Sequence, residues 1–438
     1  MPKRHSNHAG NQESLFLRLE ELVLANSGED AFEEVFKLLV AKLWDERSGQ
    51  PSRFRPHQRE AETYQAVVAL LREAEKQWPG ILDPAPSPAL TAEHLHVCVA
   101  ALAKHTLSDA GLTVMDGFFE FLTSKDAKGA KGQYFTPRHV VEFCVRMLRP
   151  GAAETVLDPA CGSGGFLIHA LNHVRREEDL TGAALQNYCS TGLWGFDIDA
   201  RATRVAKALM ILAGDSGANI FQLNSLLKPS PGGLSLFEAP GTAESGTSLS
   251  VEDVCRTRMR RHKGFDVILT NPPFAGDVRE PLVLESYSLS RGRRRVERDV
   301  LFLERCVQLL RPGGRLAIVL PHNKFAVSAW GYVREWLLRK VRVLAVVGLG
   351  RHTFLPHTHQ KAAVLFARKY GDKETPVKDP NLFFAISERD GKNSKGQFLT
   401  RPGAGDLDSP WESVDHDLAD VVGGFHKFCE QESVVLGA

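Results

Sequence analysis

Residues Thr155–Ile168, with the sequence TVLDPACGSGGFLI, decide the fold of this chain. A short apolar strand ends at Asp158, and a glycine-rich turn then opens an apolar-periodic segment that is typical of a helix. Glycines in such a turn let the backbone approach a ligand and pack the helix tightly against the strand. Because Asp158 puts negative charge where a pyrophosphate would otherwise lie, the turn favours a cationic or zwitterionic ligand over NAD.

The segments after this turn continue the alternation of strand and helix. Leu193–Asp197 is a second apolar run, Arg201–Ala213 has apolar residues at helical spacing, and Asn219–Leu223 is expected to form a third strand that ends at Asn224. This rhythm predicts a Rossmann-like α/β fold, in which a parallel sheet has helices on both faces. An acidic residue that ends the second strand is well placed to hold ribose hydroxyls, so Asp197 is the favoured ribose ligand. Asp199 could equally cap the following helix.

Phe265–Phe274, with the sequence FDVILTNPPF, joins a buried strand to an Asn-Pro-Pro-aromatic turn. The turn would place the Asn271 amide, a backbone carbonyl and the Phe274 ring at the carboxyl end of the strand, where α/β proteins bind ligands. Proline fixes φ and has no N–H, so Pro272 and Pro273 make the turn stiff and leave its carbonyls as acceptors. Such a set fits a planar amino group on a heterocycle, because two acceptors can accept hydrogen bonds from its N–H groups while the Phe274 ring stacks on the heterocycle.

The chemistry that needs this arrangement is alkylation of an exocyclic amine, whose lone pair is delocalised into its ring. Acceptors placed out of line draw the nitrogen toward tetrahedral geometry and make the lone pair available. No strong base is required, because the proton becomes acidic once the nitrogen is alkylated. Positioning and preorganised dipoles would therefore supply the catalysis. A strand followed by an ordinary proline-rich turn has the same bare Asn-Pro-Pro sequence.

A third stretch, Gly132–Arg138 with the sequence GQYFTPR, precedes apolar residues at helical spacing. Thr136 is a natural helix N-cap and Pro137 a natural first helical residue. A helix start alone would explain both residues. The functional interpretation puts Thr136 and the neighbouring backbone amides on a carboxylate, because helix N-termini bind anions.

In this order, the three stretches resemble the adenine-N6 DNA methyltransferases, and in particular the modification subunit of type I restriction-modification systems. The resemblance covers roughly residues 105–370. It implies transfer of a methyl group from S-adenosyl-L-methionine to the N6 amino group of an adenine that has left the duplex. The sequence differs from the family at Asn224, because Asp or Ser is usual after the third strand. The Asn224 amide can still accept a hydrogen bond from the cofactor's amino group.

The resemblance assigns roles to the residues of the three stretches. Asp197 would hold the ribose of the cofactor. The other cofactor-binding residues are Gln133, Tyr134, Phe135, Thr136, Pro137, Arg138, Asp158, Gly162, Ser163, Gly164, Gly165 and Asn224. The flipped adenine would be held by the catalytic turn, which consists of Asn271, Pro272, Pro273 and Phe274.

The 438 residues are expected to form an α-helical N-terminal domain over residues 1–125, a catalytic domain over 126–370 and a C-terminal tail of unknown role over 371–438. Apolar residues recur on one helical face between Phe32 and Leu43, which predicts the first domain. Strands at Arg315–Leu320, Val343–Val347 and Ala362–Ala367 should finish the sheet, and the resemblance implies that the last two form a hairpin. Pro229–Ser250 is rich in Gly, Ser and Pro, which predicts an insertion loop.

Composition limits what the chain could bind by itself. Its 54 basic and 53 acidic residues give a net charge of +1, so contact with DNA must be local or shared with a partner. The seven cysteines have no C-x-x-C pairing, which argues against a disulfide framework or a zinc site, and no metal is expected. No apolar run approaches the ~18 residues of a membrane span and no signal-peptide pattern is present, so a cytoplasmic protein without membrane contact is expected.

Two basic clusters could supply local contact with DNA. The first consists of Arg256, Arg258, Arg260, Arg261 and Lys263, and the second of Arg291, Arg293, Arg294, Arg295 and Arg298. Charge runs are usually solvated loops. The alternative for the second cluster is a clamp on the phosphates that flank the extruded base.

The expected sheet uses the chain after the catalytic turn, which leaves little for a module that reads base pairs in the major groove. We therefore expect that this chain does not choose its own DNA site. The resemblance implies that two copies assemble with a separate specificity subunit on double-stranded DNA. It also implies a restriction subunit in the full complex.

Other functions remain as alternatives. Asn-Pro-Pro-aromatic also occurs in enzymes that methylate protein glutamine or guanine amines in RNA. Cytosine N4 is another acceptor, although that chemistry usually accompanies Ser at the position of Asn271. A non-catalytic cofactor-binding scaffold in a DNA-defence complex is the non-enzymatic alternative, and intact Asn271 and Asp158 argue against it. A dehydrogenase fits least, because Asp158 disfavours a pyrophosphate.

Overall fold

The computed structural model describes residues 18–19, 21–23, 29–83, 85–107, 135–214, 219–229, 250–259, 263–402 and 410–436. Gln133, Tyr134, Arg260, Arg261 and most of the expected insertion loop lie outside these ranges. The chain divides into two compact units. The first comprises residues 1–126, 204–218 and 404–409, and the second comprises 127–203, 219–403 and 410–438.

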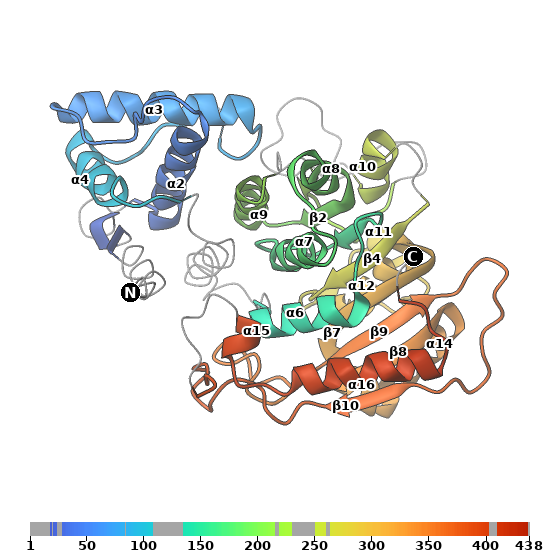
Figure 1. Cartoon of the computed structure of the whole chain (residues 1–438). Helices are drawn as coiled ribbons and strands as arrows, with labels where there is room; N and C mark the ends of the chain where they lie inside the picture. Colours follow the sequence, from blue (N-terminus) through green and yellow to red (C-terminus); the bar gives the residue numbers. More distant parts are fainter. Residues whose placement is uncertain are drawn as a thin grey trace. The chain divides into compact units, whose positions relative to one another are not determined.

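Three helices dominate the described part of the first unit: α2 (Ala31–Arg47), α3 (Glu60–Gln77) and α4 (Ala92–Leu102) (Figure 1). The Trp44 ring meets the edge of Trp78 at a centroid distance of 5.3 Å. Trp44 Nε1 also donates to a Glu73 carboxylate oxygen at 2.9 Å, which joins α2 to α3. This unit is therefore helical, and contacts of the half-buried Trp44 join α2 to α3 and to the buried Trp78 that follows it.

The second unit is built on an eight-stranded sheet in the order β10-β8-β9-β7-β4-β1-β2-β3. Neighbouring strands are parallel, except that β9 is antiparallel to both β7 and β8. This topology confirms the predicted α/β sheet and the hairpin near its end. The strands are β1 (Val156–Asp158), β2 (Leu193–Asp197), β3 (Ile220–Gln222), β4 (Phe265–Thr270), β7 (Leu310–Pro321), β8 (Val341–Gly348), β9 (Ala362–Lys369) and β10 (Phe383–Ile386).

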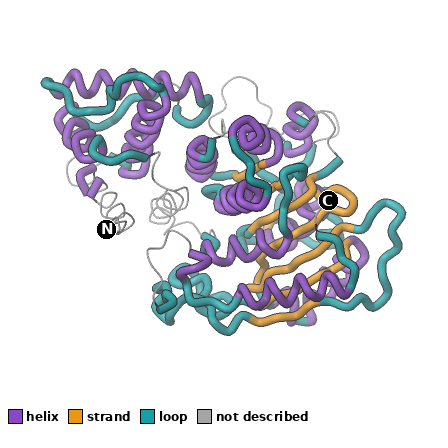
Figure 2. The backbone as a smooth tube through the Cα atoms, viewed as in Figure 1, coloured by secondary structure: helices purple, strands orange, loops and turns teal. Residues whose placement is uncertain are grey.

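Helices cover both faces of this sheet (Figures 1 and 2). On one face, the Phe366 ring of β9 contacts Phe143 at 5.5 Å and Phe425 at 6.0 Å. The longer helices of this unit are α6 (Arg138–Leu148), α7 (Gly165–Glu177), α8 (Gly182–Gly192), α10 (Val251–Arg258), α12 (Arg298–Leu309), α14 (Gly331–Lys340) and α16 (Leu418–Gln431), and α9 (Ala200–Leu212) belongs to the first unit from residue 204 onward. Shorter elements are β5 (Asp277–Val278), α11 (Pro281–Leu284), β6 (Val296–Glu297), α13 (Asn323–Ala326), η2 (Ser328–Trp330) and α15 (Pro410–Ser413).

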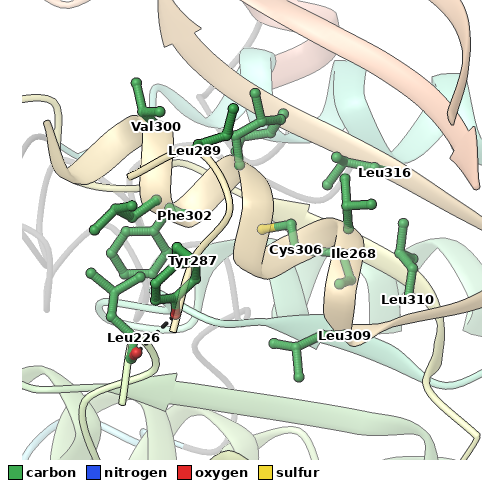
Figure 3. Packing of buried hydrophobic residues seen from close by; sticks show 14 of the residues in the cluster. Leu226, Ile268, Tyr287, Leu289, Val300, Phe302, Cys306, Leu309, Leu310 and Leu316 are labelled. Atoms are coloured by element: carbon green, nitrogen blue, oxygen red, sulfur yellow. Dashed lines mark hydrogen bonds between the residues drawn. The ribbon is translucent and has the colours of Figure 1, made fainter. Parts of the chain in front are cut away.

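The opposite face of the sheet carries the apolar core shown in Figure 3. Ile268 and Leu316 of the central strands pack in one cluster with Cys306 of α12. Within the cluster, the Tyr287 hydroxyl donates to the Leu226 carbonyl at 2.8 Å, so the one polar group of this side chain is satisfied. This core holds the segment after β4 firmly against the sheet.

Two expectations about this unit are wrong. The sheet does not finish with the β8–β9 hairpin, because β10, from the expected tail, pairs with β8 in parallel register. β10 is an apolar run of only four residues, Phe383–Ile386, and Phe384 and Ile386 are each 71% exposed, so it does not have the length and burial of a core strand. β7 also begins at Leu310, earlier than the expected Arg315. Among the described helices, none combines the length and hydropathy of a bilayer-spanning segment.

Candidate active site

The candidate site lies where β4, β1 and β2 end side by side. Leu157 of β1 pairs in parallel with Ile268 of β4 and with Trp194 of β2. Because the three strands share one direction, Asp158, Asp197 and the Asn271 turn all follow at the same edge of the sheet. The fold therefore brings together the three residue groups that the sequence analysis placed at strand ends.

Asp158 is a buried carboxyl whose hydrogen-bond partners are uncharged. Its Oδ1 accepts from the Thr270 hydroxyl at 2.7 Å and from the Ala160 N–H at 3.0 Å. Burial raises the pKa of Asp158 to about 7, although both hydrogen bonds oppose the shift; the neighbouring Asp197 adds to it. Sequence reasoning missed Thr270, and its position directly before Asn-Pro-Pro was the available signal.

Asp197 joins the glycine-rich turn to the end of β2. Its Oδ2 accepts from the Gly162 N–H at 2.8 Å and its Oδ1 from the Asp199 N–H at 2.9 Å. Burial raises the pKa of Asp197 above its ordinary value. Asp199 has a different role, because its Oδ1 accepts from the Arg201 N–H at 2.8 Å and so caps α9.

The glycine-rich turn has the backbone that its sequence requires. Gly162 has φ of +50° and Gly164 has φ of +88°, which L side chains rarely adopt. A Cβ built on Gly162 would meet no atom within 4 Å, so open space lies over this residue. At Gly165 a Cβ would lie 2.1 Å from Arg138 Nη1, so the start of α7 must be glycine for Arg138 to pack there. The intervening Ser163 is buried.

The Gly132–Arg138 stretch and the catalytic turn meet through one hydrogen bond. Asn271 Nδ2 donates to Thr136 Oγ1 at 2.9 Å, and 135 positions of sequence separate the two residues. The predicted capping roles are wrong: α6 starts at Arg138, Pro137 is its N-cap residue, and no side chain caps it. Phe135, the first described residue of the stretch, is half-buried.

The remaining parts of the catalytic turn are largely buried, and its aromatic residue contacts the segment after β8. Phe274 is buried, and its ring lies 6.1 Å from that of Phe354 with an interplanar angle of 73°. Pro272 is buried and Pro273 half-buried. The aromatic residue of the turn therefore has a fixed neighbour.

The third strand contributes less directly than expected. Asn224 Oδ1 accepts from the Leu226 N–H at 3.0 Å and so closes a turn. Next to it, the Ser225 hydroxyl donates to the Pro159 carbonyl at 2.6 Å and ties this turn to the end of β1. Ile198, which sequence reasoning missed, is 63% exposed between Asp197 and Asp199. An apolar residue between two acids at a strand end was the signal for it.

The second arginine cluster lies on the segment between the catalytic turn and α12, and its last member, Arg298, is the first residue of α12. Its five arginines are exposed. Arg295 Nη1 lies 3.3 Å from an Asp277 carboxylate oxygen, and the Arg293 guanidinium lies 3.9 Å from the centre of the Tyr332 ring. Among the residues that the structure describes, no group of three His, Cys, Asp or Glu side chains could hold a metal ion.

Comparison with known families now identifies the class of the protein. A family model described as N-6 DNA Methylase matches residues 111–419, which is more than half of the chain. The chain therefore belongs to this family, and the resemblance inferred from the three stretches is confirmed.

Individual relatives agree with this family. The chain is similar to the type I restriction enzyme EcoEI methylase subunit of Escherichia coli, with 28% identity over 255 residues that cover 58% of this chain and 46% of that protein. It is also similar to the StySPI methylase subunit of Salmonella potsdam, with 27% identity over 267 residues, or 60% of this chain and 45% of that protein. The chain thus spans about half the length of the curated relatives it matches.

The fold agrees as well. A type I restriction-modification system methyltransferase subunit from Streptococcus thermophilus has a TM-score of 0.59, covering 96% of this chain and 94% of that chain at 14% identity. The second unit therefore has the Rossmann-like sheet of that subunit's fold, and the helical N-terminal region precedes it in sequence.

Proposed function

We propose that this chain transfers a methyl group from S-adenosyl-L-methionine to the N6 amino group of adenine in double-stranded DNA. Family membership supports the reaction class. The observation that carries the proposal is the hydrogen bond from Asn271 Nδ2 to Thr136 Oγ1, because it links the expected amine site to the expected cofactor site. Asn271 would thus contact adenine, which accepts the methyl group, while Thr136 contacts S-adenosylmethionine, which donates it.

The residues at the strand ends fit the cofactor. Asp197 accepts from the Gly162 and Asp199 amides, and a carboxylate can accept about four hydrogen bonds, so ribose hydroxyls could also donate to it. The exposed Ile198 would pack on the purine, and the space over Gly162 would admit the chain that joins ribose to sulfur. Asp158 is buried with uncharged partners, and a nearby cation would favour its ionised form. When bound, S-adenosylmethionine supplies an electrophilic methyl group on a sulfonium.

Thr136 can serve the cofactor and Asn271 together. Its hydroxyl oxygen accepts from Asn271 Nδ2, and a hydroxyl also has one proton to donate, here to the methionine carboxylate. The remaining members of this stretch are also proposed to line the cofactor site around that contact: Gln133, Tyr134, Pro137 and Arg138.

The catalytic turn would hold the acceptor. With its amide nitrogen bonded to Thr136, Asn271 directs its amide oxygen to the opposite side, where it would accept from the adenine amine. The Pro272 carbonyl would accept the second N–H, and Phe274 would stack on the base, which is worth ~1–3 kcal/mol in comparable sites. Held this way by the Asn271 and Pro272 oxygens, the N6 lone pair would face the methyl group that the bound cofactor supplies, and the surplus N6 proton would pass to water after transfer.

DNA would approach over the second arginine cluster. An adenine must leave the duplex to reach the turn, so its flanking phosphates need a fixed place. The exposed arginines that follow the catalytic turn would supply it as a phosphate clamp (Arg291, Arg293, Arg294, Arg295 and Arg298). Such contacts add affinity and carry no sequence information.

The assembly and domain assignments are further parts of the proposal. The relatives are named as methylase subunits of type I restriction enzymes, which supports a separate specificity subunit for this chain, with two copies bound to it, and a restriction subunit in the full complex. Within the chain, residues 1–125 would be the helical domain and 126–370 the catalytic domain.

A methyl-transfer assay tests this function. The chain is mixed with its specificity subunit, tritiated S-adenosylmethionine and DNA, RNA or protein, and the labelled product is identified after digestion. N6-methyladenine in DNA is expected, with site-specific transfer only when the specificity subunit is present. N4-methylcytosine, methylguanine in RNA or methylglutamine would redirect the assignment, and cofactor binding without any transfer would favour a scaffold.

A further inference from the structure

We propose that residues 387–402 and 410–416, here called the brace, position Thr136 against Asn271 by holding the start of α6. The brace belongs to the segment that sequence analysis left without a role. Its catalytic consequence rests on the proposed function, whereas its effect on α6 does not.

The brace contacts α6 through a buried imidazole. His139 lies three residues after Thr136 and is 1% exposed. Its ring stacks on that of His416 at a centroid distance of 5.4 Å and an interplanar angle of 13°. The Phe398 ring meets it edge-on at 6.1 Å, and a Cβ on Gly391 would lie 3.4 Å from His139 Nε2. Three residues of the brace thus surround the first turn of α6.

The brace is itself tied to the sheet. Its Ser387 N–H donates to the Gly348 carbonyl at the end of β8 at 2.9 Å. Isolated bridges pair Asp390 with His416, Lys392 with Phe398 and Thr400 with Val414. The buried Lys392 ammonium donates to the Leu355 carbonyl at 2.8 Å. The bridges hold the brace together internally, and a displaced brace would have to break the Ser387–Gly348 and Lys392–Leu355 hydrogen bonds.

Contacts with α7 hold the middle of α6, and the brace contacts the helix before and after that point. Glu142 accepts from His169 Nδ1 of α7 at 2.9 Å and from Arg146 Nε at 2.8 Å. The Arg146 guanidinium lies 4.7 Å from the centre of the Trp411 ring, and His416 Nε2 lies 3.0 Å from the Trp411 carbonyl oxygen. The brace therefore contacts α6 in its first turn, at His139, and again about two turns later, at Arg146.

The imidazoles of this contact act as neutral rings. Burial lowers the pKa of His139 to about 3, and the nearby His416 and Lys392 add to the effect. Burial also lowers the pKa of His416 to about 4, with Arg401 in the same direction and Asp417 and Asp415 opposing it. Both rings are therefore uncharged near neutral pH, and the contact between them is packing.

Gly391→Ala tests the brace with a single methyl group. Gly391 has φ of +72°, and its added Cβ would lie 2.4 Å from Val414 Cγ1 and reach His139. The matched control is Gly182→Ala in the same unit, where φ is +52° and a Cβ would meet nothing within 4 Å. Both changes strain the backbone, and only the first displaces the brace.

The first readout is hydrogen exchange of peptides that span residues 136–143. The amides of Val140 and Val141 donate to the Pro137 carbonyl at 2.8 and 3.1 Å, so they report on the first turn of α6. We expect about tenfold faster exchange in Gly391→Ala and unchanged exchange in Gly182→Ala. Unchanged exchange in both variants would overturn the brace, whatever the chain's activity is.

The second readout is kcat per molecule of bound cofactor at saturating DNA. A misplaced Thr136 should lower it at least about tenfold in Gly391→Ala, because small displacements of positioning groups are costly in catalysis. His416→Phe, which keeps an aromatic ring to stack on His139, should retain more of this rate and of the exchange protection than His416→Ala. Equal losses in the two His416 variants would contradict the contact. Faster exchange in Gly391→Ala together with an inactive wild-type chain would refute the proposed function alone.

Discussion

The carboxylates at the two ends of the central strands have different partners. At the amino ends, Asp266 accepts from the Thr155 hydroxyl at 2.6 Å and forms an ion pair with Arg311. The buried Glu154 pairs with Arg315 through two oxygens at 2.7 Å. Burial would raise the pKa of Asp266, but Thr155 and Arg311 together lower it below its ordinary value.

At the carboxyl ends of the same sheet, Asp158 and Asp197 are bonded to a hydroxyl and to backbone amides. Burial raises the pKa of both groups. The amino-end charges are thus matched by arginines of the chain and stabilise the fold. The carboxyl-end groups carry a cost of burial that a bound ligand could reduce, which is typical of a functional site.

Replacing Asn271 should have the largest effect at the carboxyl ends. Asn271→Ala removes the oxygen that would accept from the adenine amine, and kcat should fall about 10²–10³-fold or more. Cofactor affinity should stay within about threefold, measured by calorimetry with S-adenosylhomocysteine. Thr136→Ser keeps the acceptor hydroxyl for Asn271 and serves as the control that retains activity. Full turnover by Asn271→Ala would end the assignment of this residue.

The comparison of the two ends becomes sharper with Asp197→Ala and Asp266→Ala. Loss of Asp197 should weaken S-adenosylhomocysteine binding by about 10–100-fold, because ribose bonds to a charged acceptor are worth ~1.5–3 kcal/mol. Loss of Asp266 should leave that affinity unchanged and lower the urea midpoint, because Arg311 loses its partner. Calorimetry and urea unfolding on both variants separate the two outcomes. Equal loss of affinity in both would remove the distinction between the ends.

The pH dependence of stability should differ between the ends. The folded-state pKa of Asp158, about 7, lies above its unfolded value, so the folded chain binds the extra proton between these values. As pH rises from about 4 to 7, Asp158 should reduce the free energy of unfolding by up to ~4 kcal/mol. The lowered pKa of Asp266 predicts the opposite sign: its contribution is present above the unfolded pKa and is lost as pH falls through the folded value.

Asp158→Asn measures this effect, because an amide does not titrate. The variant should lack the part of the slope between pH 5 and 7 that the wild-type chain shows in urea unfolding. Asp266→Asn should keep that slope. A wild-type slope in Asp158→Asn would mean that the carboxyl ionises in the fold as easily as in water.

The smallest effect is expected from the exposed arginines, and it concerns the affinity for DNA rather than the chemical step. Changing Arg293, Arg294 and Arg295 to Ala should reduce the slope of log affinity for DNA against log salt by ~0.9 for each phosphate that the chain no longer neutralises. Changing Lys373, Lys378 and Lys395, which are exposed elsewhere, removes the same charge and should leave most of the slope. Fluorescence anisotropy over a salt series measures both. An unchanged slope in the arginine variant would refute the clamp.

The sequence pattern predicted those parts of the structure that residues adjacent in the chain determine. The apolar strand, the glycine turn and the helix after Asp158 follow from adjacent residues, and parallel strands then bring Asp158, Asp197 and Asn271 to one edge. Thr136 was expected to cap its own helix, because sequence cannot show a partner 135 positions away. The stacking of His139 on His416 was hidden for the same reason.

A crystal structure of the chain with S-adenosylhomocysteine tests the central claim most directly. We expect the ribose hydroxyls within hydrogen-bond distance of Asp197, and the sulfur facing the Asn271 amide, which keeps its bond to Thr136. An Asn271 side chain turned away from the sulfur, or a ligand bound apart from the Gly162–Gly165 turn, would contradict it.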